Sequence, residues 1–188
     1  MKVQFFADFI ESFGKILTAL KDIKNIPKRQ RDEIRRPLAD TFIMLNTTLN
    51  MVIIRLGEVY RLQDEQAFRQ EVAQLQYGET WLKSERAFRL CESLKHGLRE
   101  WQNIDQSLIN LLSTNNWNDL KLQMENILKN ESELAYFIEE NFRRLESLAF
   151  DEAKPIDVLK EEIQSLQNML SKQRRELIEL ESTMYNLL

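Results

Sequence analysis

The sequence predicts an all-α fold: an up-and-down antiparallel bundle of about four to five long helices, ending in a coiled-coil-like C-terminal helix. The first observation is the spacing of apolar residues near the C-terminus, which alternates between three and four residues over about four heptads. The second is the scarcity of turn formers, since the 188 residues include only 4 glycines and 3 prolines. The third is that no segment shows the apolar–polar alternation between turn signals that is typical of strands.

Composition is that of a folded domain without a polyanion-binding surface. Hydrophobic residues make up 43% of the chain, enough to bury a core, so we expect residues 1–188 to form a single helical-bundle domain. The net charge of −4 does not suggest the concentrated basic surface that a nucleic-acid-binding protein needs. Cys91 stands alone and cannot form an intramolecular disulfide, which favours a cytoplasmic location. Asp8 and Glu11 interrupt the apolar N-terminus, so we expect no secretory signal.

The first expected helix runs from about Lys2 to Lys24. It ends before Pro27, because a residue that precedes proline is disfavoured in the α region. One stripe of the helix is apolar and its other positions carry mixed charges, so the helix is amphipathic. The stripe consists of Phe6, Ile10, Phe13, Leu17 and Leu20.

The second expected helix begins in the charged segment at Lys28 and continues to about Leu62. Pro37 should start a new helical segment or kink the helix, since proline lacks an N–H and clashes with the preceding turn. The apolar face that follows is wide, so we expect this helix to be the most buried, although it falls short of a membrane span. That face comprises Phe42, Leu45, Leu49, Val52, Leu56 and Val59, widened by Ile43, Met51, Ile53 and Ile54.

A third helix is expected after the polar joint that follows Leu62. Asp64 is a suitable N-cap, and the helix should reach about Leu112 with its bend or break at Tyr77-Gly78. The cluster Ser113–Asn116 predicts a loop, because its side chains compete with helix for backbone hydrogen bonds. A fourth helix then runs from about Trp117 to Phe150.

The last helix should start with Pro155 as its first residue, where a missing N–H costs nothing. Its apolar row has one polar interruption, Gln173, which should find a polar partner or an exposed edge. The row consists of Ile156, Leu159, Ile163, Leu166, Leu170, Gln173, Leu177, Leu180, Met184 and Leu187.

Flanking residues argue that this helix packs within its own chain. A parallel homodimer would place Glu176 against Glu181 of the other copy, a repulsive pair, and would form no salt bridge at such positions. Four apolar residues off the row should widen the buried face: Val158, Met169, Ile178 and Tyr185. We therefore expect antiparallel packing, mainly against the preceding helix, with any dimer contact secondary.

Residues suited to metal or cofactor chemistry are few. His96 is the only histidine, which excludes the ligand set of di-iron bundles that resemble ferritin, where two helices each supply a histidine. Glu92, His96 and Glu100 share one helical row, but such rows are common on charged helices. We predict no metal site, no cofactor and no small-molecule substrate.

One spacing points to an enzyme. Arg89 and His96 are separated by six residues, which resembles the Arg-x-x-x-x-x-x-His motif of the helical ribonuclease family called HEPN. The resemblance covers eight residues, and Leu90 replaces the polar residue usual after that arginine. It implies that Arg89 and His96 would engage the scissile RNA phosphate from one helical face.

The only basic cluster lies at the start of the second helix and consists of Lys28, Arg29, Arg31, Arg35 and Arg36. Asp32 and Glu33 dilute its charge and no aromatic residues are interleaved for base stacking, so a solvated helix start is favoured over a nucleic-acid site. Contact with anionic lipid is the other interpretation, because the first helix carries an aromatic stripe suited to a membrane interface.

The leading functional hypothesis is a cytoplasmic, non-enzymatic helical bundle that acts through protein–protein interaction or self-association. We therefore assign no catalytic, cofactor-binding or metal-binding residue. The first alternative is a membrane-active bundle, similar in layout to cell-death effectors, that inserts its amphipathic first helix. The second alternative is a HEPN-like ribonuclease using Arg89 and His96.

Overall fold

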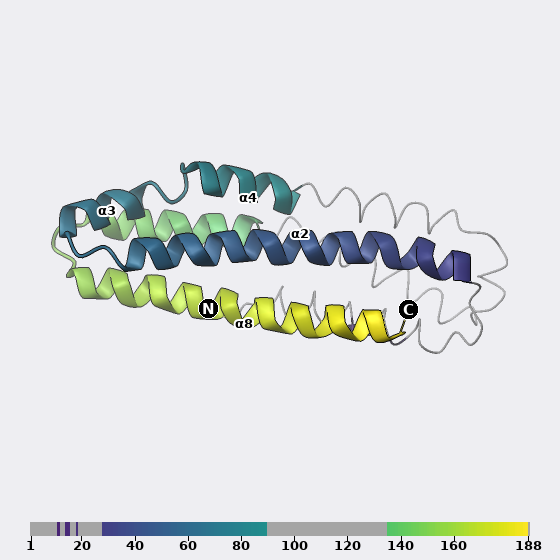
Figure 1. Cartoon of the computed structure of the whole chain (residues 1–188). Coiled ribbons are helices and arrows are strands. Elements are labelled where there is room, and N and C mark those ends of the chain that lie inside the picture. The colour runs from purple at the N-terminus through teal and green to yellow at the C-terminus, as the bar shows by residue number, and fades with distance from the viewer. Residues whose placement is uncertain (1–10, 12–13, 16–17, 19–27, 90–134, 188) are drawn as a thin grey trace.

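The computed structural model describes residues 11, 14–15, 18, 28–89 and 135–187 of the chain. These residues form helices and short connections and include no strand, which confirms the all-α class (Figure 1). The helices are α2 (Lys28–Tyr60), α3 (Glu65–Ala73), α4 (Glu79–Arg89), a helical segment over 135–150, and α8 (Ile156–Leu187).

Of the first expected helix, four residues are described and all four are helical. Lys15 Nζ lies 2.7 Å from Glu11 Oε1, and Thr18 Oγ1 donates to the Gly14 carbonyl at 2.9 Å. Both are contacts between residues four apart, as on one helical face. The predicted stripe of Phe6, Ile10, Phe13, Leu17 and Leu20 lies outside the described residues.

Helix α2 passes through Pro37 without interruption (Figure 1). The expectation of a new segment there is therefore wrong. Proline removes a single backbone donor, the one that would reach the Glu33 carbonyl, and the turns on both sides maintain the helix. The helix ends at Tyr60, two residues before the predicted Leu62, and Arg61 and Leu62 donate to the carbonyls of Glu58 and Val59 as the last turn tightens.

The cap and the break predicted beyond α2 are confirmed. Asp64 Oδ1 accepts the Ala67 N–H at 2.7 Å, the interaction of an N-cap side chain with the N3 position. Helix α3 then ends at Ala73, and residues 74–78 form turns in which Gly78 N–H donates to the Gln74 carbonyl at 2.8 Å. The expected continuation from Arg89 to Leu112, and the following loop, lie outside the described residues.

The segment 135–150 ends where the sequence predicts, and a short turn leads to α8. Pro155 precedes α8 instead of being its first residue, and its carbonyl accepts the Val158 N–H at 3.1 Å. Arg69 of α3 holds this turn. Its guanidinium donates to the carbonyls of Ala149 at 3.3 Å, Asp151 at 3.3 Å and Lys154 at 2.6 Å. Ala149 lies in the last turn of segment 135–150, where helix carbonyls lack intrahelical partners, and the Asp151 carbonyl also accepts the Lys154 N–H at 3.0 Å.

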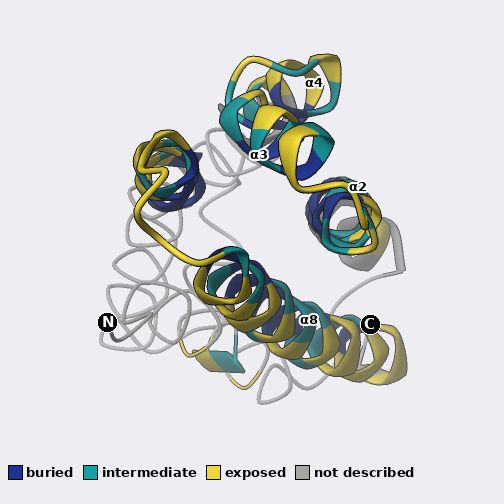
Figure 2. Cartoon of the chain, turned by 90° about the vertical axis from the view of Figure 1, so that its left-hand side faces the viewer, coloured by how far each residue is buried: buried dark blue, intermediate teal, exposed yellow. Residues whose placement is uncertain are grey.

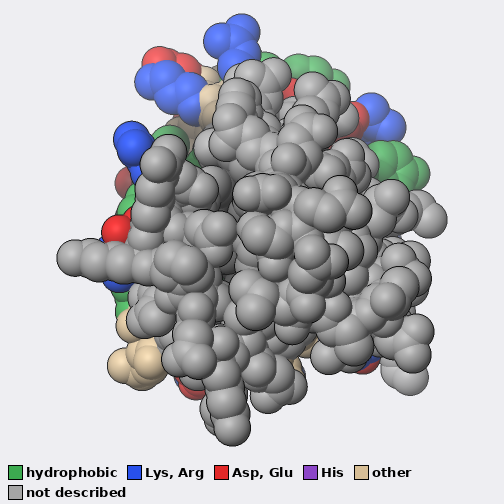
Figure 3. Space-filling model, turned by 90° about the vertical axis from the view of Figure 1, so that its right-hand side faces the viewer, with side chains coloured by type: hydrophobic (Ala, Val, Ile, Leu, Met, Phe, Trp, Pro, Cys, Tyr) green, Lys and Arg blue, Asp and Glu red, His purple; other side chains and the backbone are tan. Residues whose placement is uncertain are grey.

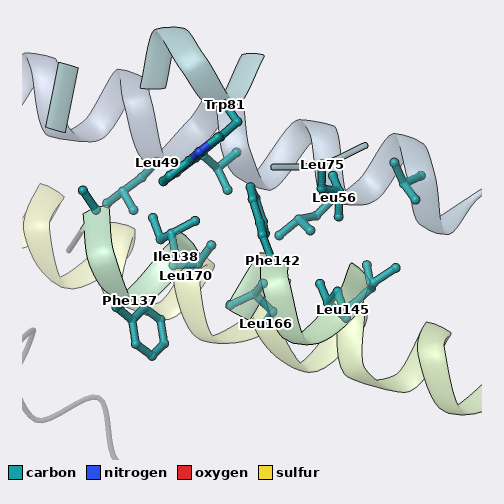
Figure 4. Close-up of a cluster of buried hydrophobic side chains, with 14 of the residues drawn as sticks. Leu49, Leu56, Leu75, Trp81, Phe137, Ile138, Phe142, Leu145, Leu166 and Leu170 are labelled. Atoms are coloured by element: carbon teal, nitrogen blue, oxygen red, sulfur yellow. The ribbon is translucent and has the colours of Figure 1, made fainter. Parts of the chain in front are cut away.

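The helices surround a common core (Figure 2). Helices α2 and α8, the segment 135–150 and the α3–α4 pair turn their buried sides toward one another. Trp81 of α4 meets Phe142 edge-to-face, with ring centroids 5.2 Å apart, and Leu49, Ile138 and Leu170 extend the same cluster (Figure 4). Side chains from four parts of the sequence therefore fill one interior.

The C-terminal apolar row packs inside the chain. Seven of its members are buried, among them Leu159, Ile163 and Leu170 at 0% exposure, and Ile156 and Leu180 are partly buried. The side chain of Leu187, the last residue of α8, lies outside the described ones. Gln173 is buried at 8% exposure, and its Oε1 has no hydrogen-bond partner among the described residues. The expected exposed edge is therefore wrong, and the expected polar partner of Gln173 is not found for its Oε1 among the described residues.

Several residues expected to widen the buried faces point outward. On α8, Val158, Ile178 and Tyr185 are 37–48% exposed, whereas Met169 does pack against the core. On α2, Ile43 and Ile54 are 53% and 52% exposed, although Ile53 packs against the core. The two long helices each bury one side only, so apolar residues beyond that side remain in contact with solvent.

Candidate interaction surface

Helix α2 carries two rows of residues, each with alternating spacings of three and four. The inner row is apolar, is at most 4% exposed and faces the other helices: Phe42, Leu45, Leu49, Val52, Leu56 and Val59. The outer row lies on the opposite side and is exposed or partly exposed: Arg36, Asp40, Ile43, Thr47, Asn50, Ile54, Gly57 and Arg61. Since the spacing is the same, side-chain chemistry alone distinguishes the two rows.

One flank of α2 is covered by α8, which runs antiparallel to it. Gln167 Nε2 donates to the Ile53 carbonyl at 3.1 Å, and one heptad further along α8, Arg174 Nε donates to Asn46 Oδ1 at 2.6 Å. One heptad earlier, Lys160 Nζ lies 6.0 Å from the centre of the Tyr60 ring. Each step of seven residues forward on α8 matches a step of seven back on α2. A constant register of polar contacts therefore fixes how the two helices lie.

Gly57 allows the closest of these approaches. A Cβ at this position would lie 2.8 Å from Gln167 Nε2, too close for an ordinary contact. Without a side chain at Gly57, the Gln167 amide reaches the Ile53 carbonyl on the same turn of α2. The space that Gly57 leaves is therefore occupied by the Gln167 amide in the α2–α8 contact, and the helical backbone itself does not need a glycine here.

The other flank of α2 packs against α3 and α4. Arg55 forms an ion pair with Glu71 of α3 and lies 3.5 Å from Glu58 of its own helix. Thr48, on the same side, is 3% exposed and donates to the Met44 carbonyl at 2.8 Å. With both flanks covered, only the outer row of α2 faces away from the rest of the described helices.

The middle of the outer row is free of charge. From Thr41 through Ile54 the sequence contains no Asp, Glu, Lys, Arg or His, on any face of the helix, in a chain whose composition is 30% charged. We call its four central residues, Ile43, Thr47, Asn50 and Ile54, the outer strip of α2. Exposed helix faces are normally charged, and depletion of charge is typical of the central part of protein interfaces. The strip is therefore the candidate functional surface.

Charges return at both ends of the strip. Arg36 and Asp40 are exposed at one end, and Glu58 and Arg61 at the other, so each end has one acidic and one basic residue. Elsewhere on the described surface the two signs are also interspersed, as Figure 3 shows for the coloured side chains at one end of the molecule. The strip differs from its surroundings in having no charge at all.

A longer stretch of α2 that includes the outer strip has the length and composition of a membrane span. By length and composition, Phe42–Tyr60 is the one helical stretch within the described residues that could cross a bilayer. The expectation that this helix falls short of a membrane span stays a prediction, because the stretch reaches this length only by including Arg55 and Glu58. A core helix passes the same test, and the inner row of α2 is buried against other helices.

Only some of the residues considered for catalysis or metal binding are among the described residues. Arg89 is the last residue of α4, and His96 lies outside the described residues together with Glu92, Glu100 and Cys91. In the described part of the chain, no group of three or more His, Cys, Asp or Glu is placed to hold a metal ion. Lys83 hydrogen bonds to Glu79 and, through this bond and its charge, lowers the pKa of that carboxyl, but the pair is an exposed contact between successive turns of α4.

Comparison of the chain with family models, curated proteins and solved structures finds no match. The functional argument therefore depends on the outer strip itself. Sequence analysis assigned Ile43 and Ile54 to the buried face and missed the strip. The uncharged run from Thr41 to Ile54 was the signal that could have found it.

Proposed function

We propose that this chain is a non-enzymatic helical bundle that acts through protein–protein interaction or self-association. In this proposal the helices form an up-and-down antiparallel bundle in which α8 packs as in a coiled coil. The observation that carries the proposal is the outer strip of α2, where Ile43 and Ile54 are more than half exposed without any charged neighbour on the strip. Apolar surface of this kind is stabilised when a partner covers it.

Two measurements on the full chain test this proposal. The first is sedimentation over a wide protein concentration range, which detects self-association. The second is affinity capture from source cells with the wild-type chain and an Ile54→Glu variant as parallel baits. We expect association with self or with a defined protein that is lost in the variant. A chain that remains monomeric and captures nothing that depends on Ile54 would contradict the proposal.

The second candidate function is a membrane-active bundle. It is favoured by one observation, the length and apolar composition of Phe42–Tyr60. Insertion would require the inner row of α2 to leave the core, since spanning helices face lipid or other spanning helices. Leakage and co-flotation with vesicles of neutral and anionic phospholipid test this candidate, which predicts binding that increases when the bundle is destabilised.

A further inference from the structure

We propose that a second copy of this chain covers the outer strip, with the two α2 helices antiparallel about a two-fold axis that passes between Thr47 and Asn50. This inference rests on the proposed function and names the partner of the same surface. The axis position follows from the spacing of the strip, since Ile43 and Ile54 lie equally far from it, as do Thr47 and Asn50. A two-fold contact of this kind uses the same surface on both copies.

The pairing matches side-chain chemistry at every level of the strip. Ile43 faces Ile54 of the second copy, so two apolar residues that are each more than half exposed become covered by each other. Thr47 faces Asn50 of the second copy, where a hydroxyl and a carboxamide both donate and accept hydrogen bonds. Each of these contacts occurs twice. No charged side chain lies near the axis, where a charge would be close to its own copy.

The charges at the ends favour the antiparallel arrangement. It brings the end with Arg36 and Asp40 next to the end with Glu58 and Arg61 of the second copy. Arg36 then lies opposite Arg61, but Glu58 and Asp40 are one turn away from that pair, within reach of both guanidinium groups. A parallel pair would place Asp40 against Asp40 and Glu58 against Glu58. The antiparallel pair therefore opposes one pair of like charges at each end, Arg36 with Arg61, whereas the parallel pair opposes like charges at all four positions.

A lipid surface fits the same strip less well. Thr47 and Asn50 place two polar side chains at its centre, where a bilayer offers no hydrogen-bond partner. The α8 and α3–α4 flanks of α2 are already in contact with protein, so α2 presents one narrow face instead of the all-round apolar surface of a spanning helix. A second helix of the same composition covers a narrow face and satisfies both polar residues.

Sedimentation of full-length variants tests the inference. Ile54→Glu places two unpaired carboxylates in each dimer, so its dimer dissociation constant should rise about a hundredfold or more. Tyr136→Glu is the matched control, because Tyr136 is 60% exposed on segment 135–150 and should leave the constant unchanged. Thr47→Lys gives a second disruption at an exposed helical position if Ile54→Glu does not fold by circular dichroism.

Cross-linking tests the orientation. In a Cys91→Ser background, the double variant Ile43→Cys, Ile54→Cys should form a covalent dimer on oxidation, whereas Ile43→Cys alone should not. Efficient cross-linking of the single variant would show a parallel pair and overturn the inference. A wild-type chain that stays monomeric would also overturn the inference. If this monomer captured another protein in an Ile54-dependent way, the proposed function would remain intact, and if it bound vesicles in an Ile54-dependent way, lipid would be the occupant of the strip. If it bound no protein and no vesicles, both the inference and the proposed function would be contradicted.

Discussion

The inner and outer rows of α2 have the same heptad spacing and opposite environments. Leu56 on the inner row is 0% exposed, whereas Ile54, two residues earlier, is 52% exposed. Both are large aliphatic side chains on one continuous helix, so neither residue type nor spacing decides which is buried. The neighbouring helices decide it, because α8 and the α3–α4 pair cover the two flanks of the inner row. A heptad row therefore predicts that a face can pack, but not that its partner belongs to the same chain.

The largest expected effect separates these two residues directly. Leu56→Ala should lower the free energy of unfolding by about 2–5 kcal/mol, because it removes buried methyl groups and leaves a cavity. Ile54→Ala, measured under dilute conditions where association is negligible, should change it by no more than about 0.5 kcal/mol. Urea denaturation at low protein concentration makes the comparison. Equal losses for the two variants would show that the outer strip is part of the folded core.

A second prediction concerns the turn between segment 135–150 and α8, which positions α8 against α2. Arg69→Ala should lower the free energy of unfolding by about 2–3 kcal/mol, since three backbone carbonyls lose a charged donor. Arg69→Lys should restore only part of the lost free energy of unfolding, because an ammonium group cannot reproduce the planar fork of donors of the guanidinium. Arg143→Ala, at an arginine 62% exposed and paired with Glu139, is the control and should cost about 0.5 kcal/mol or less. Full recovery in Arg69→Lys would contradict the proposed role of the fork.

A smaller effect is expected at Gly57, where the α2–α8 contact is closest. Gly57→Ala should be nearly neutral, because a gain in helix propensity of about 0.5–1 kcal/mol offsets displacement of the Gln167 amide. In a Gln167→Ala background the clash is absent, so Gly57→Ala should stabilise by about 0.5–1 kcal/mol. A double-mutant cycle by thermal unfolding measures the coupling. No coupling would mean that Gln167 does not need the space at Gly57.

The smallest effect concerns Glu79, away from both rows of α2. Its pKa is lowered in the folded chain by the hydrogen bond and charge of Lys83, so the associated stabilisation is present above the ordinary carboxyl pKa and is lost as the pH falls through the lowered value. Lys83→Ala should return the pKa of Glu79 toward its ordinary range, as measured by NMR titration of the carboxyl carbon. A pKa that does not change would assign the shift to another cause. Because both side chains are mostly exposed, we expect no measurable change in melting temperature at high salt.

The sequence predicts the helices better than it predicts their surroundings. Three features could be predicted from the sequence because each depends on the chemistry of a few neighbouring residues: the cap at Asp64, the break near Gly78 and the end of segment 135–150. The Arg69 contacts join residues about eighty positions apart, and no local pattern indicates them. Gln173 was expected to find a polar partner or an exposed edge, and the structure instead buries it with no partner for its Oε1 among the described residues.

The candidate surface was missed for a related reason. A wide apolar face predicts burial, and Ile43 and Ile54 were assigned to it, but only the placement of α8 and α4 shows that the outer strip lies beyond the reach of the described helices. The one sign of the strip in the sequence is the absence of charged residues from Thr41 to Ile54. The Arg89 and His96 spacing stays a prediction, because His96 lies outside the described residues.

The dependence of melting temperature on protein concentration tests the central claim most directly. If the inner row of α2 stabilises the single chain and the outer strip binds a second copy, association will stabilise the folded state by mass action. The wild-type melting temperature should then rise with concentration, while that of Ile54→Glu should be constant and equal to the wild-type value at high dilution. A wild-type melting temperature that is independent of concentration from the micromolar to the millimolar range would contradict the claim.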